Sequence, residues 1–349
     1  MIASTNSKMK KVPGKKEKQV KKKSGNKTGP IGMSAGYDLN ILFPVLFLTG
    51  IGIAMVYSAS SALALKEFGT DSYFLRKQAL FALMGIIMLV FCRHIPFKIY
   101  WPMTYPLLTL SIILLFLVFI PGIGHSAGGA NRWLRIGQWT FQPSEASRLT
   151  LIIFMAYSLS KKQPNIGKFS IGFVPHIMVL ATFCILLLFQ PDFGTILIFC
   201  TIAWIMMFVA GVKLIHLGIP LFIILPILAM VLVKSPYRLD RIMVFWDPWR
   251  YPTEGGYQVI HSLMAFGTGG LFGTGIGQSY QKLFYLPEPH TDFIFSVIGE
   301  EIGLLGVLLI LGMYIWIMWR GILIARNAEN TFGSLLATGI VTALALQVT

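Results

Sequence analysis

Residues 286–303 read LPEPHTDFIFSVIGEEIG, and in this stretch a polar loop turns into an apolar helix. Charge at bilayer depth is energetically costly and usually faces a cavity or a partner, so ionisable residues at such a point indicate a functional site. The stretch therefore predicts both a membrane helix and a site at its entrance. Five of its residues are ionisable: Glu288, His290, Asp292, Glu300 and Glu301.

The polar residues of this predicted helix repeat every four positions. We expect Thr291 to cap the helix, because threonine is a favoured N-cap residue and prolines precede it. Asp292, Ser296 and Glu300 then share one face of the helix. Glu301 lies off that face. At a rise of about 1.5 Å per residue, the pattern predicts a polar seam that runs roughly 12 Å into the membrane.

The rest of the chain is apolar enough to belong in a membrane. Hydrophobic residues make up 55% of the 349 residues and charged residues 12%, with a mean hydropathy of +0.70. Soluble domains carry about 25% charged residues, and the apolar runs here are continuous rather than alternating as in barrel strands. Cys92, Cys184 and Cys200 show no paired spacing, so neither a disulfide framework nor a metal site is indicated. The predicted class is an all-α polytopic membrane protein.

Hydropathy predicts about nine membrane-spanning helices, each long enough to cross the bilayer core. The basic N-terminal segment and the short basic connections favour a cytoplasmic N-terminus by the positive-inside rule. The last span stops at Thr349 without a basic flank, so we expect the chain to end inside a helix. The spans lie near 39–60, 75–92, 103–121, 141–160, 170–189, 192–211, 214–234, 292–318 and 331–349.

The N-terminal segment is basic and poor in large apolar residues. Residues 1–40 hold ten lysines against Glu17 and Asp38. Such a segment cannot bury enough surface to fold, so we expect residues 1–37 to form a disordered cytoplasmic tail and residues 38–349 to form the transmembrane domain. The tail is expected to bind anionic lipids of the inner leaflet, at about 1 kcal/mol per lysine near the surface, rather than nucleic acid.

Two segments on the predicted outer side are long and rich in arginine and tryptophan. They are residues 122–140 and the extracytoplasmic loop 235–291, and loops as long as the second are uncommon unless they have a function. One guanidinium group can bind two phosphate oxygens at once, so Arg132, Arg238 and Arg241 are candidate ligands for a pyrophosphate. The neighbouring tryptophans are equally typical of interfacial anchors.

A run of glycines at 267–277 lies inside the longer of these segments. It matches neither of the common glycine-rich phosphate-binding motifs, so nucleotide binding is not indicated. We interpret the run as flexible backbone that allows close turns and close packing.

Glu145 and Arg148 stand three residues apart at the start of the fourth predicted span. Residues at that spacing are neighbours on a helix. Two interpretations stay open: an ion pair that neutralises itself, or two charges that face the same cavity as Asp292. Asp192, in QPDFGT (190–195), is interpreted as part of a tight turn between the fifth and sixth spans.

Six strings of the sequence, taken together and in order, resemble one family of membrane proteins. This is the SEDS family (shape, elongation, division and sporulation). The sequences of the strings resemble the division (FtsW-like) and sporulation members more than the rod-elongation member. The resemblance extends from about residue 38 to the end. The strings are MVYSAS (55–60), GANRWLRIG (129–137), FQPSE (141–145), QPDFGT (190–195), GYQVIHSLMAFGTGGLFGTGIGQSYQK (256–282) and LPEPHTDFIFSVIGEE (286–301).

The resemblance implies a ten-helix fold in the bacterial cell membrane and peptidoglycan glycosyltransferase activity. The implied substrates are lipid II and the nascent glycan. The implied partners are a class B penicillin-binding protein, which acts as transpeptidase, and other proteins of the division machinery. Asp292 matches the family's essential aspartate. Arg148 stands where the family commonly has lysine, and the family's tenth span, with its SYGGSS-like string, is missing after Thr349.

The implied reaction joins a 4-hydroxyl of one lipid-linked disaccharide to the anomeric carbon of another. Such a step needs a base and needs cations near the leaving pyrophosphate. Asp292 is the candidate base, and Lys282 joins the arginines as a candidate phosphate ligand. Glu288 and His290 are candidate substrate-binding residues, with Glu300 as a supporting charge. A divalent cation, Mg²⁺ or Mn²⁺, stays open, because carboxylates and substrate phosphates can hold one without a dedicated metal cage.

Two other functions stay open at this point. The first is a transporter that flips lipid II and uses the charged seam as its path, and the second is a scaffold for the division machinery. A transporter is expected to place its site near the middle of the membrane. The position of the carboxylates in a long outer segment therefore favours the polymerase.

Overall fold

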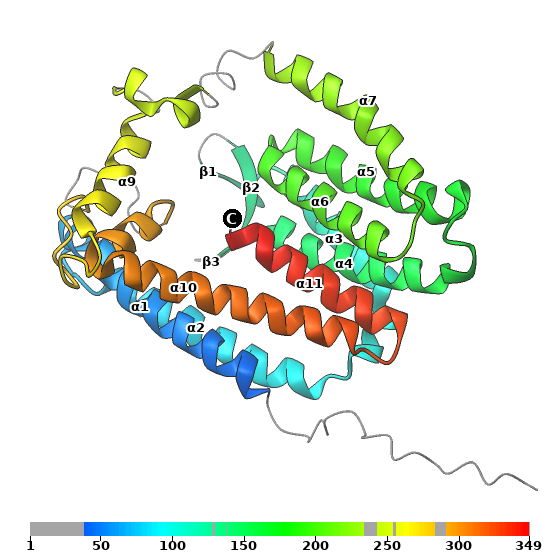
Figure 1. Cartoon of the computed structure of the whole chain (residues 1–349), viewed down its shortest axis with the longest axis horizontal. Helices are drawn as coiled ribbons and strands as arrows, with labels where there is room; N and C mark the ends of the chain where they lie inside the picture. Colours follow the sequence, from blue (N-terminus) through cyan, green and yellow to red (C-terminus); the bar gives the residue numbers. More distant parts are fainter. Residues whose placement is uncertain are drawn as a thin grey trace, which may run out of the picture. The chain divides into compact units, whose positions relative to one another are not determined.

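The computed structural model describes residues 38–127, 130–137, 139–233, 243–253, 256–282 and 291–348. Within these residues the chain is helical apart from one small sheet and the connections (Figure 1). The predicted tail, 1–37, lies outside the described residues. The helices are α1 (Leu39–Phe68), α2 (Tyr73–His94), α3 (Tyr100–Leu117), α4 (Pro143–Lys161), α5 (Val174–Phe189), α6 (Phe193–Val209), α7 (Leu214–Val233), α9 (Gly256–Gly269), α10 (Ile294–Arg326) and α11 (Thr331–Val348), with short helical turns at Phe97–Ile99, Gln163–Asn165, Phe169–Phe173 and Pro248–Arg250.

The protein is an all-α polytopic membrane protein, as predicted. Six helices in the described part of the chain are long and apolar enough to cross a membrane, and α6 is a shorter apolar helix. A helix lies in each of the nine predicted ranges, and α1 and α10 run further than predicted, to Phe68 and Arg326. The number of membrane crossings stays a prediction.

The larger apolar core surrounds α4, and we refer to it as the α4 core. Leu151, Met155 and Leu159 of this helix are fully buried, and α3, α6 and α11 pack around it (Figure 1). α4 is buried along most of its length, and its buried residues include Ser147, Thr150 and Ser158 as well as apolar side chains. Gly339 of α11 permits the close approach, because a Cβ atom there would lie 2.5 Å from the side chain of Ile152.

A second, smaller apolar core lies between α1 and α10. Met55 and Ala59 of α1 are buried with Val297 and Val307 of α10, and Phe266 of α9 packs against them. Figure 1 shows α1 and α10 running side by side, with α9 beside the first turns of α10. This core therefore brings the start of α10, which carries the predicted site, against the second half of α1.

A three-stranded antiparallel sheet lies between α3 and α4 in the chain. The sequence predicts no strand here, because short strands interrupted by glycine carry little alternation. His125 pairs with Trp133, and Leu134 pairs with Phe141. The strands, in sheet order, are β1 (Gly124–Ala127), β2 (Ala130–Ile136) and β3 (Trp139–Phe141).

Candidate functional site

The helix that carries the predicted site is broken. Gly303 has φ 75° and ψ −174°, far from helical values, so residues 294–302 and the longer part after Gly303 are two helical segments. A break of this kind leaves backbone N–H and C=O groups without their helical partners. At membrane depth such groups must find partners within the protein, because lipid offers none.

The glycine-rich segment that follows α9 supplies these partners. It runs against the break closely enough for its backbone to replace the lost helical hydrogen bonds. The break is thus stabilised by a second stretch of chain. Four backbone hydrogen bonds join the two stretches: Thr274 N–H to Glu300 O (2.9 Å), Gly275 N–H to Glu301 O (3.1 Å), Leu304 N–H to Gly270 O (3.0 Å) and Leu305 N–H to Leu271 O (3.2 Å).

Two glycines make this close approach possible. Gly273 has φ 81°, and a Cβ atom on it would lie 2.2 Å from the carbonyl oxygen of Glu301. A Cβ atom on Gly303 would lie 2.3 Å from the backbone nitrogen of Gly273. Any other residue would be strained at both positions, since a positive φ and lack of space act together. The interpretation of the glycine run as close backbone packing is confirmed.

The carboxylate of Glu301 lies at the centre of a buried polar contact. Lys282 Nζ is 2.7 Å from Glu301 Oε1 and 3.1 Å from Ser58 Oγ of α1. Ser58 Oγ lies 2.7 Å from both carboxylate oxygens and donates its proton to the carboxylate. The side chains of Lys282 and Glu301 are 6% and 0% exposed, so the pair is shielded from solvent.

The neighbouring carboxylate, Glu300, is satisfied by the turn that precedes Lys282. It is completely buried and accepts a hydrogen bond from the hydroxyl of Ser279. The backbone N–H groups of Tyr280 and Gln281 donate to its two oxygens at 3.0 and 3.4 Å. Hydrogen bonds of this kind satisfy a polar group that is buried away from water. Ser58, Ser279, Lys282, Glu300 and Glu301 together are called the broken-helix site below.

Helix α9 closes one side of the broken-helix site. The hydroxyls of Ser262 on α9 and Ser296 on α10 lie 2.5 Å apart. His261 Nδ1 lies 2.8 Å from Gln281 Oε1, which joins α9 to the turn that binds Glu300. Ser296 and Glu300 are both buried, so the predicted polar face of α10 is confirmed for these two residues.

Asp292 lies outside this buried set, at the entrance to α10. The helix begins at Ile294 with Phe293 as its N-cap residue, so the prediction that Thr291 caps it is wrong. Thr291 and Asp292 belong to a turn, and the Asp292 side chain is exposed. Asp292 therefore does not continue the helical face of Ser296 and Glu300. Its carboxylate is open to a ligand at the end of a helix whose dipole favours negative charge.

Arg132 joins the small sheet to the turn between α5 and α6. Its guanidinium donates to the carbonyls of Gln190 (3.1 Å) and Pro191 (2.6 Å) and lies 3.9 Å from the carboxylate of Asp192. Asp192 in turn caps α6 by accepting from the N–H and hydroxyl of Thr195, in keeping with its interpretation as a turn residue. The Arg132 side chain stays 34% exposed, and its role as a phosphate ligand stays a prediction.

Glu145 and Arg148 form the ion pair that their spacing predicts. Arg148 Nη2 lies 2.7 Å from Glu145 Oε1, with the arginine side chain buried and the glutamate half exposed. Arg148 Nε is buried and has no hydrogen-bond partner among the described residues. None of the ion pairs and hydrogen bonds found in the described part of the chain joins this pair to Asp292. The shared cavity stays a prediction.

Four predicted site residues lie outside the described residues: Arg238, Arg241, Glu288 and His290. Lys282 is described, and its ammonium is held by Glu301 and Ser58. Sequence reasoning missed Ser58 and Ser279 and set Glu301 aside. The available signal was a group of serines in an apolar run (Ser58, Ser60 and Ser61) and a polar string, QSYQK (278–282), in the segment that precedes the carboxylates. Within the described ranges, no three His, Cys, Asp or Glu side chains lie close enough together to hold a metal ion.

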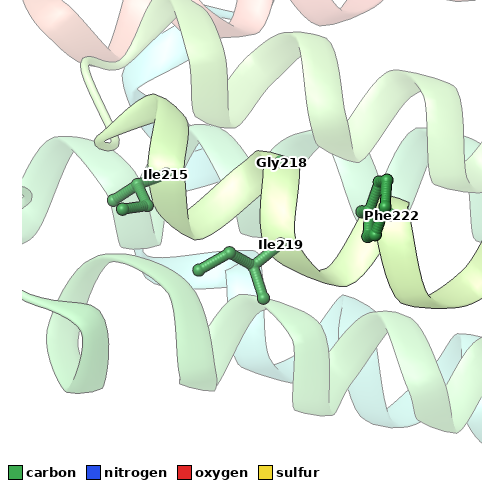
Figure 2. Close-up of a pocket in the computed structure, with 4 residues that line it drawn as sticks. All are labelled: Ile215, Gly218, Ile219 and Phe222. Carbon is green, nitrogen blue, oxygen red and sulfur yellow. The ribbon is translucent and has the colours of Figure 1, made fainter.

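Two hollows on the helices are apolar and do not suit charged chemistry. One is lined by Ile215, Gly218, Ile219 and Phe222 of α7, as Figure 2 shows. The other lies between the start of α1 and the middle of α10. Acyl chains suit such surfaces, whereas a pyrophosphate does not.

The comparison of sequences identifies close relatives. Residues 39–349 match the FtsW/RodA/SpoVE family, described as cell cycle protein. A probable peptidoglycan glycosyltransferase FtsW from Geobacter sp. (strain M18) is 44% identical over 313 residues, which cover 89% of this chain and 85% of the relative. Stage V sporulation protein E from Bacillus subtilis (strain 168) is 40% identical over 316 residues, with 89% and 85% covered.

Solved structures resemble the fold. A structure reported under "Structural coordination of polymerization and crosslinking by a peptidoglycan synthase complex" matches with a TM-score of 0.72 and 26% identity, over 90% of this chain and 85% of that chain. Rod shape determining protein RodA from Thermus thermophilus matches with a TM-score of 0.65 and 25% identity, over 90% and 83%. Sequence and fold thus point to the same group of proteins.

Proposed function

Because the chain belongs to the FtsW/RodA/SpoVE family, we propose that it is a peptidoglycan glycosyltransferase that polymerises glycan strands from lipid II. The observation that carries this proposal is the match over residues 39–349, with a relative named as a peptidoglycan glycosyltransferase at 44% identity. The glycan is made during cell division or sporulation, since relatives of both kinds match along nearly the whole chain.

The reaction transfers a sugar with inversion at the anomeric carbon. The 4-hydroxyl oxygen of one lipid-linked disaccharide forms a bond to the anomeric carbon of another, and the bond from that carbon to the pyrophosphate breaks. The hydroxyl proton goes to a base, and undecaprenyl pyrophosphate leaves with the bonding electron pair. The protein must hold both sugars in line and stabilise the charge that develops on the leaving group.

Asp292 is the base in this proposal. A general base must come within hydrogen-bond reach of the hydroxyl. Asp292 is exposed and lies two residues before the first residue of α10. Glu300 and Glu301 are already occupied by protein donors and cannot bind a substrate without breaking those contacts. The difference in exposure supports Asp292 over its neighbours.

The leaving pyrophosphate is bound by arginines of the outer segments. Arg132, Arg238 and Arg241 are the candidates, with Glu288 and His290 beside the sugars. Arg132 is partly exposed on β2, a strand that contacts α4. A guanidinium suits this role because it stays charged and binds two phosphate oxygens at once. A divalent cation, Mg²⁺ or Mn²⁺, would be held by a carboxylate of the site together with the substrate phosphates and would neutralise charge on the leaving group.

The active site faces the outside of the bacterial cell membrane, and the basic N-terminal tail faces the cytoplasm. The lysines of the tail support this orientation through the positive-inside rule. A class B penicillin-binding protein is the proposed partner, because a synthase complex that coordinates polymerization and crosslinking shares this fold. Division-machinery proteins are further proposed partners, and the tail binds anionic lipids.

The test is polymerisation of purified lipid II in detergent by the wild type and by Asp292→Ala. We expect the variant to lose glycan synthesis by about 1000-fold, because removal of a general base costs roughly 10²–10⁴ in rate. Glu67→Ala is the matched control, since it removes another exposed acidic side chain, at the end of α1. Undiminished synthesis by Asp292→Ala would refute the assignment.

The same protein in vesicles separates the polymerase from the transporter. Fluorescent lipid II is placed in one leaflet, and both translocation and glycan length are followed. Glycan formation without net translocation supports the proposal. Translocation without polymer would instead assign the chain as a lipid II flippase.

A further inference from the structure

The contact of Lys282 with Glu301 and Ser58 joins three distant parts of the chain. Ser58 lies on α1, 243 positions before Glu301, and Lys282 lies 19 positions before Glu301. In the proposed reaction none of these three residues acts as the base or binds the substrate. Three buried polar groups without a chemical role call for another explanation.

Because the Lys282 ammonium is buried, it depends on its protein partners for hydrogen bonds and for charge neutralisation. A buried charge is tolerated when it is paired and hydrogen-bonded, and loss of one partner leaves an uncompensated charge. The ammonium makes two contacts, at 2.7 and 3.1 Å, and its side chain is 6% exposed. To reach a phosphate, it would have to leave Glu301 unpaired in the interior. This argues against Lys282 as a substrate ligand.

The contact also fixes the first helical segment of α10, which begins two residues after Asp292. Glu301 lies at the far end of this segment, nine positions after Asp292. A segment whose side chains are held by fixed partners samples fewer positions than a free one. A second contact fixes the same segment, because the N–H groups of Tyr280 and Gln281 bind the carboxylate of Glu300. Both carboxylates of the segment that follows Asp292 are therefore held in place.

We propose that the contact of Lys282 with Glu301 and Ser58 positions Asp292 for the transfer reaction. Lys282 and Glu301 are positioning residues that act through the first helical segment of α10, and neither touches the substrate. The inference rests on the proposed function of Asp292. A base displaced from its hydroxyl loses rate steeply, because proton transfer needs hydrogen-bond distance.

A double-mutant cycle tests the proposal. The variants are Lys282→Met, Glu301→Gln and the double variant, and glycan synthesis from lipid II is measured at varied lipid II concentration. The double variant is the decisive one, because it buries no unpaired charge and is therefore expected to fold. We expect all three variants to lower kcat by a similar factor of about 100, as for a misplaced catalytic group, with KM nearly unchanged. Lys98→Met, at an exposed lysine, is the matched control and keeps wild-type kinetics.

Independent action of the two residues would overturn the proposal. If Lys282 bound a phosphate, Lys282→Met would raise KM, and Glu301→Gln would act separately, so that the two effects multiplied in the double variant. Ser58→Ala provides a milder variant that keeps both charges. It is expected to lower kcat by about threefold to tenfold, less than the double variant, because it loses the hydroxyl that donates to Glu301 and accepts from Lys282 but keeps the ion pair between them. An unchanged kcat for both Ser58→Ala and the double variant would also overturn the proposal.

A spectroscopic measurement separates this inference from the proposed function. A nitroxide is attached through Asp292→Cys in a background with Cys92→Ala, Cys184→Ala and Cys200→Ala, and no substrate is needed. We expect the label to move faster when Lys282→Met and Glu301→Gln are added, and to be unaffected by Lys98→Met. Faster motion without any glycan synthesis by the wild type refutes only the proposed function. Synthesis by the wild type with unchanged label motion in the double variant refutes only the positioning role.

Discussion

The α4 core and the broken-helix site bury helices by opposite means. Around the middle of α4 the contacts are mostly apolar, and Leu151 and Met155 are completely covered. At the start of α10 the contacts are carboxylates, hydroxyls and backbone groups, with Glu300 and Glu301 as deeply buried as the leucines. Apolar contacts have no direction, whereas hydrogen bonds and ion pairs require defined geometry. We therefore expect changes in the α4 core to lower stability and changes at the break to lower activity as well.

Gly303→Ala is expected to have the largest effect. The residue has φ 75°, and a Cβ atom would lie 2.3 Å from the nitrogen of Gly273. The added methyl group forces the two backbone stretches apart, so the free energy of unfolding should fall by about 4 kcal/mol, at the upper end of single-residue effects. Denaturation in detergent measures it. Gly52→Ala in α1 is the control, since nothing lies within 4 Å of that position. Equal stability of the two variants would contradict the account of the break.

Leu151→Ala tests the other half of the comparison. The side chain is 0% exposed inside the α4 core, and its truncation leaves a cavity, so the free energy of unfolding should fall by about 3 kcal/mol. The protein that remains folded should keep its kcat, because the cavity lies among apolar groups. Leu149→Ala is the matched control, as the neighbouring side chain is 50% exposed. A loss of kcat without loss of stability would show that the α4 core is not merely apolar support.

Glu145→Ala removes the partner of Arg148, the buried charged residue of α4. Removal of the carboxylate leaves the buried Arg148 guanidinium unpaired and should lower the free energy of unfolding by about 2 kcal/mol, less than for a fully buried pair because Glu145 is half exposed. Addition of Arg148→Met should restore stability. Glycan synthesis by the double variant then decides between the two interpretations of the pair. Normal synthesis supports a self-neutralising pair, and lost synthesis supports charges that face the cavity of Asp292.

Ser262→Ala is expected to have the smallest effect. It removes the contact between the hydroxyls of α9 and α10, and such contacts between membrane helices contribute about 0.6 kcal/mol to the free energy of unfolding. Thr268→Ala is the control, because that hydroxyl bonds only within α9, to the carbonyl of Met264. A loss as large as that of Leu151→Ala would mean that α9 is held to α10 mainly by this one contact.

The sequence predicted the helices well because hydropathy is a local property. Each apolar run lies within a few residues of a described helix, and the spacing of Glu145 and Arg148 predicted their contact. The start of α10 was predicted two residues too early. Thr291 is a good N-cap by type, but the chain keeps a turn through Asp292 and begins the helix at Ile294. Residue type alone does not say where a turn ends.

The broken-helix site could be predicted only in part. The carboxylates and glycines were conspicuous, and their concentration near one helix indicated a site. Their partners were not predictable, because Ser58 stands 243 positions from Glu301. The sequence also predicted Lys282 as a phosphate ligand, and the structure buries its side chain against Glu301 and Ser58. Such contacts depend on which helices become neighbours, and no periodicity encodes that.

The sequence by itself determined that this chain is a polytopic helical membrane protein, that its family is that of the SEDS proteins, and that chemistry concentrates near residues 286–303. These follow from apolar length, local spacing and long shared strings, which need no knowledge of the fold. Only the tertiary structure decided that α10 breaks at Gly303, that glycine backbone repairs the break, and that Glu301 holds Lys282 while Asp292 stays exposed. The physical reason is that the burial and the pairing of a side chain depend on which residues are its neighbours in space. Those neighbours decide whether a charged side chain forms an internal ion pair or stays accessible to a substrate.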